Sequence, residues 1–336
     1  MRPNGLNRRE FLGRSLGMAG AAGLLAHSAL PGLLPAQAQG QANSTSIRRP
    51  DRFEDSFIFE RKPFTWPQGK TLAVWLVPNI EVWHFDSSAG AAASPVPADR
   101  VPDVINYGWR EYGIRVGLWR MADIFDSAGV RPTVALNAAI CEVYPRAVEE
   151  MKRRGWEFMG HGITNTRTLA NLPIEEEREV IRTTLRTIER ATGQRPRGWL
   201  GPGLAETFNT LDLLAEEGVV YVGDWNSDDQ PFRMKVKTGK MYSVPYGTDI
   251  NDMSLILRHA YTGEQYVQAL KDQFDTLYAE SQKTARVMGI PLHPFLMGQP
   301  WRAPYLREAI AYFQKHDRVW FATGSEIVDA YERLRL

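Results

Sequence analysis

The chain has 336 residues, of which 43% are hydrophobic, 24% charged and 11% aromatic. This balance is ordinary for a globular protein and excludes a collagen, a coiled coil or a disordered chain as a description of the whole. The formal net charge is +1 and both signs are interspersed along the chain, so the sequence lacks the basic face that nucleic-acid binding requires. The single cysteine, Cys141, cannot form a disulfide within the chain and therefore does not identify the redox compartment.

Residues 1–38 have the features of a twin-arginine export signal. The paired Arg8 and Arg9 precede a weakly apolar stretch rich in Gly, Ala and Leu, and residues 36–38 supply the small residues of a cleavage site. Glycines and prolines interrupt the apolar stretch, so we expect no stable insertion into the membrane. Removal of this leader takes away four arginines and one glutamate and changes the net charge from +1 to −2. We expect a periplasmic or secreted protein whose export partner is the twin-arginine machinery; the alternative is a cytoplasmic protein with a basic N-terminus.

Residues 39–70 are polar, rich in arginine and interrupted by prolines, so we interpret them as an extended arm that lies on the main domain. From residue 71 onward, short β-branched or aromatic runs alternate with amphipathic stretches, which is the pattern of repeated βα units around a parallel sheet or barrel. Eight such runs suit a closed or nearly closed barrel. The predicted strands are residues 71–77, 132–136, 156–159, 198–200, 219–222, 241–244, 287–292 and 319–322.

Two of the intervening stretches show the spacing of helices that face a core. The apolar positions are Ile181, Leu185 and Ile188 in one, and Tyr266, Leu270, Phe274, Leu277 and Tyr278 in the other. Residues 90–97 are small and contain two prolines, so we predict a loop after the first strand.

Polar side chains follow the first and third predicted strands, at the end of a barrel where active sites lie. Glu81 comes after the first strand, and Asn79 precedes it by two residues, on the same side if the backbone stays extended. Glu81 is a candidate general base. His161 follows the third strand between two glycines, which predicts an imidazole accessible to a substrate or a metal.

The fifth and seventh predicted strands end in further polar residues. The segment 223–229 contains Asp224, Trp225 and Asp228, and such a cluster orients a histidine or binds substrate hydroxyls. His293 follows the seventh strand and is a candidate general acid. A histidine at one strand end is more often structural, so it is the recurrence at four strand ends that predicts a site. The remaining histidines lack this placement and are interpreted as structural or surface residues: His27, His84, His259 and His316.

Six longer motifs give the chain a resemblance to a known family. They are GHGITNT (160–166), TGQRPRGWLGPG (192–203), DWNSDDQP (224–231), VPYGTDINDM (244–253), DQFDTLYAE (272–280) and PLHPFLMGQP (291–300). With them, residues 71–331 resemble the polysaccharide deacetylases with a NodB homology domain, particularly the allantoinase-like branch. The resemblance implies a single catalytic domain at residues 71–336, with the α/β fold of a distorted (β/α) barrel. It also implies hydrolysis of a non-peptide carbon–nitrogen bond, typically that of an N-acetyl group on a sugar.

The resemblance further implies a metal site, from which this chain departs. Where these deacetylases have paired aspartates after the first strand, this chain has Asn79 and Glu81; where they have two histidines four residues apart, it has His161 and Asn165. These deacetylases also have an arginine after the fourth strand, and this chain has the residues around Leu200 at that place. Glu81 and His161 remain as candidate ligands of a divalent metal such as zinc, but a catalytic zinc site usually has three protein ligands. Metal-independent action, considered possible in the allantoinase-like branch, is therefore favoured.

The leading hypothesis is hydrolysis of an amide or ureide, most simply deacetylation of an N-acetylated carbohydrate. Glu81 activates a water, His161 positions the water or polarises the carbonyl, and His293 protonates the departing nitrogen. Without a metal, the oxyanion needs donors such as Asn165 or backbone N–H groups. Asp224 or Asp228 would orient a histidine.

Further side chains are candidates for substrate binding. They are Asn79, Asn165, Asp224, Trp225 and Asp228. The aromatic rings of Trp225, Trp301 and Tyr246 either stack on a sugar or a flat ureide or pack the rim of the barrel. Two alternatives stay open at this point. One is a non-catalytic periplasmic carbohydrate-binding or scaffolding protein with a degenerate metal site, and the other is a metal-dependent deacetylase with a Glu/His/Asn site.

Overall fold

Residues 49–86 and 101–334 are described by the computed structural model. The predicted leader, the predicted arm up to residue 48 and the predicted loop at residues 90–97 lie outside the described residues. Among the helices that the structure describes, none combines the length and the apolar character needed to cross a bilayer.

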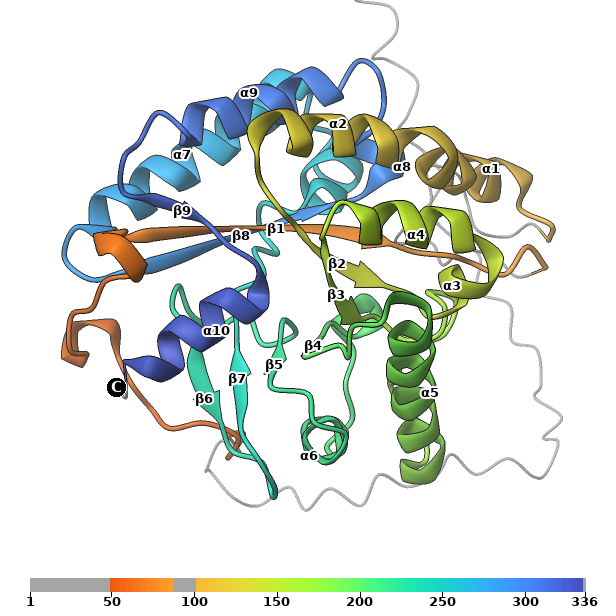
Figure 1. Ribbon diagram of the computed structural model, residues 1–336, viewed down its shortest axis with the longest axis horizontal. Helices are drawn as coiled ribbons and strands as arrows, with labels where there is room; N and C mark the ends of the chain where they lie inside the picture. Colours follow the sequence, from red (N-terminus) through yellow and green to blue (C-terminus); the bar gives the residue numbers. More distant parts are fainter. Residues whose placement is uncertain (1–48, 87–100, 335–336) are drawn as a thin grey trace, which may run out of the picture. The chain divides into compact units, whose positions relative to one another are not determined.

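One curled sheet organises the described part of the chain (Figure 1). Its strand order is β6-β7-β5-β4-β3-β2-β1-β8. Strand β9 also pairs with β1, at residues 72–74. All of these pairs are parallel except β6 with β7. The strands are β1 (Leu72–Ile80), β2 (Thr133–Leu136), β3 (Glu157–Gly160), β4 (Gly198–Trp199), β5 (Tyr221–Val222), β6 (Phe232–Met234), β7 (Met241–Ser243), β8 (Arg286–Leu292) and β9 (Val319–Phe321).

The predicted (β/α) barrel is confirmed, in a form that stays open between β8 and β6. All eight predicted strands are present, displaced by at most three residues at either end. The sequence analysis missed β6, which is three residues long and exposes Arg233 at its centre, so it lacks an apolar run.

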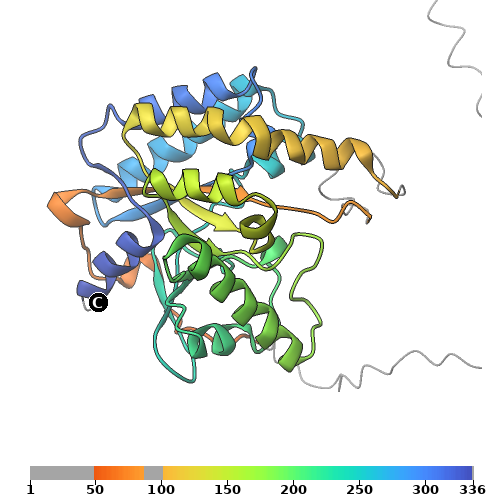
Figure 2. The ribbon, with the colours of Figure 1, turned by 45° about the vertical axis from the view of Figure 1, so that its right-hand side comes forward.

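Helices pack around the sheet. They are α1 (Val104–Tyr112), α2 (Leu118–Ala128), α3 (Ala139–Val143), α4 (Pro145–Arg153), α5 (Ile174–Thr192), α6 (Thr210–Glu216), α7 (Gly263–Ser281), α8 (Pro294–Met297), α9 (Ala303–Phe313) and α10 (Gly324–Arg333). Short 3₁₀ turns occur at η1 (Ile58–Glu60), η2 (Pro67–Gly69) and η5 (Pro202–Leu204), and π-helical turns at η4 (Gly113–Gly117) and η6 (Met253–Arg258). Figures 1 and 2 both show α2, α7 and α9 gathered above the middle of the sheet and α5 below it.

Two apolar clusters lie on opposite faces of β1. Along β1, residues 72, 74 and 76 pack against the helices, and residues 73, 75 and 77 face a second group, which we call the inner cluster. The inner cluster includes Ala73, Trp75, Val77, Met159, Leu200, Tyr221, Val244, Tyr246 and Val287. Both faces of β1 are therefore buried, as is usual for a strand inside a parallel sheet. The predicted core stripes are also confirmed: Ile181, Leu185 and Ile188 of α5 and Tyr266, Leu270, Phe274 and Leu277 of α7 are buried, and Tyr278 is half-buried.

The described part of the predicted arm contacts the barrel through polar and aromatic side chains. Arg52 donates two hydrogen bonds to Asp212 of α6, both 3.1 Å long. Trp66 is buried, and its indole N–H donates to the Arg286 carbonyl at 2.8 Å.

Candidate active site

The alternation of side chains along three strands points the predicted catalytic residues to one place. Glu81 follows β1 in the two-residue period of the side chains that face the inner cluster. By the same period, His161 continues the inner-facing series of Met159 in β3, and His293 that of Val287 in β8. Parallel strands end at one edge of the sheet, so the three side chains meet there.

Glu81 meets both imidazoles at a single carboxylate oxygen. Its Oε1 lies 3.2 Å from His161 Nε2 and 3.9 Å from His293 Nε2. The exposed fractions of Glu81, His161 and His293 are 9%, 1% and 5%. The convergence that the hydrolase hypothesis requires is thus present in the structure, while the catalytic roles of the three residues stay predictions.

A backbone carbonyl holds His161. Its Nδ1 lies 2.6 Å from the Leu200 oxygen, and because a carbonyl only accepts, Nδ1 carries a proton and Nε2 faces Glu81. The prediction that flanking glycines leave this imidazole accessible is wrong, because His161 is buried. The glycines permit close packing instead: a Cβ at Gly160 would lie 2.7 Å from the tryptophan ring of β4, and Gly162 has a φ of 67°.

A carboxylate behind His293 fixes the orientation of its ring. Asp252, next to η6, is fully buried and accepts hydrogen bonds from Nδ1 and from the backbone N–H of His293, each 2.6 Å long. His293 Nε2 is therefore the atom that faces Glu81. The prediction that Asp224 or Asp228 orients a histidine is wrong: Asp252 holds His293, and the Leu200 carbonyl holds His161.

The surroundings shift the pKa values of Glu81 and His293 in opposite directions. Burial raises the pKa of Glu81, but the charge of His293, the hydrogen bond and charge of His161 and the charge of Arg110 outweigh it, so the pKa lies below its usual value. Burial lowers the pKa of His293, but the charges of Asp252 and Glu81 and the hydrogen bond to Asp252 raise it overall. A carboxylate beside an imidazolium is the protonation state that this geometry favours.

The two asparagines predicted to bind substrate lie in different places. Asn165 Nδ2 donates to Glu81 Oε1 at 2.6 Å, while its Oδ1 is buried without a hydrogen-bond partner among the described residues. Asn79 donates to the Val77 carbonyl at 3.1 Å and to the Tyr246 hydroxyl at 3.0 Å. Asn165 therefore lies at the carboxylate, and Asn79 lies against the inner cluster.

Two of the predicted residues after β5, Asp224 and Trp225, interact with Glu206 near the same edge. Asp224 Oδ1 accepts from the Gly201 N–H at 2.8 Å, and Trp225 Nε1 donates to Glu206 Oε2 at 3.0 Å. Burial and the charge of Glu206 raise the pKa of Asp224 well above its usual value, and burial also raises the pKa of Glu206. Sequence reasoning missed Glu206 because it follows η5 rather than a strand.

Arg110 is a buried cation at this site that the sequence analysis did not single out. Its guanidinium carbon lies 4.1 Å from the centre of the Trp83 ring and 5.3 Å from that of Phe295. Trp83 follows Glu81 by two residues, and Phe295 follows His293 by two, so these rings hold the arginine between the two strand ends. Glu81 and Arg110 both line a cavity of about 10 Å³, close to the smallest volume that holds one water.

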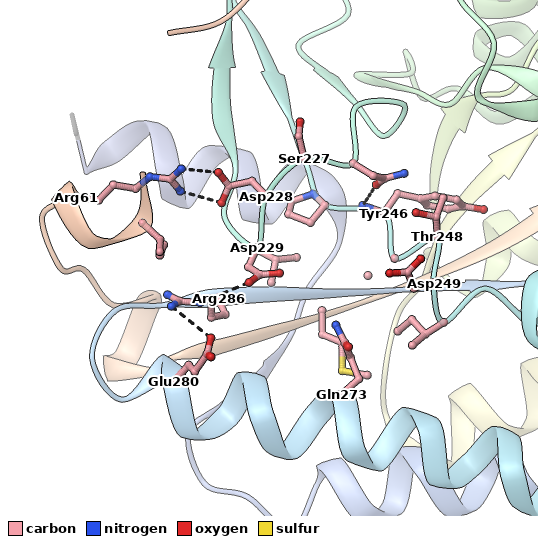
Figure 3. Close-up of a pocket in the computed structure, with 18 of the residues that line it drawn as sticks. Arg61, Ser227, Asp228, Asp229, Tyr246, Thr248, Asp249, Gln273, Glu280 and Arg286 are labelled. Atoms are coloured by element: carbon pink, nitrogen blue, oxygen red, sulfur yellow. Dashed lines mark hydrogen bonds and ion pairs between the residues drawn. The ribbon is translucent and has the colours of Figure 1, made fainter. Parts of the chain in front are cut away.

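A much larger cavity lies apart from this cluster (Figure 3). Its volume is about 640 Å³, and none of Glu81, His161 and His293 is among the residues that line it. Asp228, predicted to bind substrate, lines this cavity and forms a bidentate ion pair with Arg61, with distances of 2.8 and 2.5 Å. Asp228 therefore lines a different cavity from Glu81.

The donor set does not fit the metal site that the resemblance implied. Within residues 49–86 and 101–334, no group of three or more His, Cys, Asp or Glu side chains is arranged to hold a metal ion. Glu81 and His161 supply two donors, but Asn165 directs its N–H group rather than its oxygen at Glu81. A catalytic zinc usually takes three protein ligands, so these donors do not complete such a site.

Comparisons with known proteins place the chain in one family. The polysaccharide deacetylase family model matches residues 107–222. The solved probable polysaccharide deacetylase from Pseudomonas aeruginosa PAO1 is 31% identical, with 83% of this chain and 98% of that chain covered and a TM-score of 0.73. The solved Puue allantoinase is 27% identical, with coverage of 85% and 98% and a TM-score of 0.75. The peptidoglycan deacetylase of Helicobacter pylori is 22% identical, with coverage of 68% and 88%. The chain therefore belongs to the polysaccharide deacetylase family, whose members are hydrolases of carbon–nitrogen bonds other than peptide bonds.

Proposed function

We propose that this chain hydrolyses the C–N bond of an N-acetylated carbohydrate or a related amide or ureide, with Glu81 as general base and His293 as general acid. The proposal rests on one observation. Glu81 Oε1 and His293 Nε2 lie 3.9 Å apart, and their surroundings lower the pKa of Glu81 and raise that of His293. Environments that push two pKa values apart are typical of an acid and base pair.

The proposed reaction uses one water. Glu81 removes a proton from the water while the water oxygen bonds to the carbonyl carbon of the substrate. The C–N bond then breaks as His293 Nε2 gives its proton to the departing nitrogen, which leaves a carboxylic acid and an amine. Exchange with solvent returns Glu81 to the carboxylate and His293 to the imidazolium.

Two neighbours of Glu81 would position the reactants. Asn165 Nδ2 donates to Glu81 Oε1, and His161 Nε2 faces the same oxygen and donates to it when both ring nitrogens of His161 carry protons. The buried oxygen of Asn165 has no partner among the described residues, and a buried acceptor without a donor is costly. An amide or ureide substrate has an N–H group that satisfies it.

Arg110 would stabilise the developing oxyanion with its positive charge. We expect Arg110→Ala to lower kcat/KM by about 10²–10³-fold, the usual loss when one oxyanion donor is removed. Added guanidinium ion should restore part of the activity, because the clamp between the Trp83 and Phe295 rings remains. The measurement is steady-state hydrolysis with and without guanidinium.

Arg154→Ala is the matched control, because Arg154 also lies over a tryptophan, at 6.0 Å from the centre of the Trp119 ring, but outside the site. It should leave kcat/KM unchanged. Full activity in Arg110→Ala, or a folded variant that guanidinium does not rescue, contradicts the role of Arg110.

The names of two relatives suggest which substrates to try first. One relative is named an allantoinase, and the other a peptidoglycan deacetylase. Their names correspond to the two classes in the proposal, a ureide and an N-acetylated glycan. We propose the N-acetylated carbohydrate as the first class and the cyclic ureide as the second.

The test is product release by the purified chain from N-acetylglucosamine oligomers and from allantoin, measured with and without a chelator. Deacetylases of this family are typically metal-dependent. Here we expect acetate from the oligomers, or ring-opened product from allantoin, at the same rate in EDTA, because Glu81 and His161 do not complete a three-ligand site.

Each contrary outcome has a separate meaning. Loss of turnover in EDTA that a divalent ion restores would contradict metal-independent action and return Glu81 and His161 to the role of ligands. Absence of product from every substrate, with the chain folded, would contradict the hydrolase proposal and favour a non-catalytic binding protein.

A further inference from the structure

The large cavity of Figure 3 lies on the open side of the sheet. It separates the first half of β8 from the segments that follow β5 and β7, and its volume of about 640 Å³ is in the range of small-molecule pockets, roughly 300–1,000 Å³. Tyr246 belongs to the inner cluster and also lines this cavity, and its hydroxyl accepts a hydrogen bond from Asn79 of β1. The hydrolytic residues do not line it, so it is a second site.

Two arginines in the cavity wall differ in how well they are paired (Figure 3). Arg61 is held by the bidentate contact to Asp228. Arg286 is only 6% exposed, yet its ion-pair distances are 3.6 Å to Glu280 and 3.9 Å to Asp229, longer than hydrogen bonds. Its Nη1 donates to the Thr284 carbonyl at 2.8 Å and to the Ala285 carbonyl at 3.4 Å, whereas its Nε–H group is buried without a hydrogen-bond partner among the described residues. A buried donor of this kind requires an acceptor.

The wall opposite Arg61 carries polar side chains that can take part in further hydrogen bonds. Asp249 is exposed, lies across the cavity from Arg61 in Figure 3, and makes no hydrogen bond or ion pair with the residues that the structure describes. Gln273 of α7 also lines the cavity, and its side chain likewise makes no hydrogen bond or ion pair in that part of the chain. Phe57, 59% exposed, adds a flat apolar ring to the lining.

A ligand for this cavity must both accept and donate hydrogen bonds. It has to accept from Arg286 and donate to Asp249, and a hydroxyl group does both. Four carboxylates line the cavity against two guanidinium groups, which disfavours an anion and favours a cationic amine. The Phe57 ring suits the apolar C–H face of a pyranose. We propose that this cavity binds a carbohydrate and prefers a sugar that carries a free amino group.

This inference rests on the proposed function, because a free amino sugar is the product of N-acetyl hydrolysis. In a longer glycan, a unit that has already been deacetylated would occupy the cavity. The site would then favour substrates that are partly processed.

Calorimetry with two defined probes tests the inference. The tetramers of glucosamine and of N-acetylglucosamine are titrated into the full chain carrying Glu81→Gln, so that neither probe is consumed. We expect the glucosamine tetramer to bind more tightly. Asp249→Lys should weaken its binding by about tenfold or more, the usual cost of losing a hydrogen bond to a charged group, and Phe57→Ala should weaken both tetramers.

Asp123→Lys is the matched control, because it makes the same charge change at an exposed position of α2 outside the cavity. It should leave both affinities unchanged. The inference is overturned if neither tetramer binds, or if Asp249→Lys and Phe57→Ala leave both affinities unchanged. Hydrolysis of the acetylated tetramer by the chain with Glu81 intact is measured in parallel. Hydrolysis without cavity binding refutes the cavity alone, whereas cavity binding without hydrolysis refutes deacetylation of this glycan alone.

Discussion

Replacement of Glu81 by glutamine is expected to lower kcat by about 10²–10⁴-fold, the range that one general base contributes. The variant keeps the size of the side chain and an acceptor for Asn165, so the chain should fold and bind substrate. It cannot take a proton from water, because an amide is not a base. A group that acts only in the transition state affects kcat and kcat/KM equally, so KM should stay unchanged. The measurement is steady-state hydrolysis of the substrate found active in the panel.

Glu111→Gln is the matched control for this prediction. Glu111 lines the same small cavity as Glu81, but its carboxylate accepts a hydrogen bond from the Tyr144 hydroxyl and faces neither histidine. We expect little change in kcat. Turnover at the wild-type rate in Glu81→Gln would remove Glu81 from the role of base, and the reaction would need another proton acceptor.

The parts of the site that the sequence predicts are those attached to a repeating pattern. Glu81, His161 and His293 each follow an apolar run, and in a parallel barrel the ends of such runs meet at one edge. The period of two along a strand then determines which side chain faces inward. Neither step needs knowledge of contacts, so the convergence could be predicted from spacing alone.

Residues that reach the site from other elements left no such signal. Asp252 follows the end of β7 by nine residues and approaches His293 from the turn before η6, a distance in sequence that no strand pattern spans. Arg110 comes from helix α1, where a buried arginine has the same spacing as an ordinary helical residue. The prediction that His161 is accessible is wrong because close packing and substrate access both favour glycine at residues 160 and 162, and the sequence does not distinguish the two.

Replacement of Asp252 by asparagine is expected to lower kcat by about 10²–10⁴-fold at neutral pH, because it removes the partner of the proposed general acid. In the native chain, one carboxylate oxygen accepts from the backbone N–H of His293 and the other from Nδ1. The backbone N–H will retain the amide oxygen, so the amide NH₂ group will face Nδ1. That contact opposes the imidazolium, which must donate from Nδ1.

The pH profile distinguishes this role from a structural one. Burial lowers the pKa of His293, and the charge of Asp252 is the largest of the effects that raise it above its usual value of 6.5. In the native chain the imidazolium is therefore lost only above that value, which sets the alkaline limb of kcat/KM. Without the carboxylate the pKa falls, so the alkaline limb should move to lower pH, and the loss of activity should be smallest in acid, where the imidazolium forms again. Asp224→Asn is the comparison, since Asp224 makes no contact with His293; the limb should stay in place even if KM rises. An alkaline limb at the same pH in Asp252→Asn and the native chain would show that His293 does not supply the proton. His161, whose Nε2 faces the same carboxylate oxygen, would then be the remaining imidazole able to protonate the departing nitrogen.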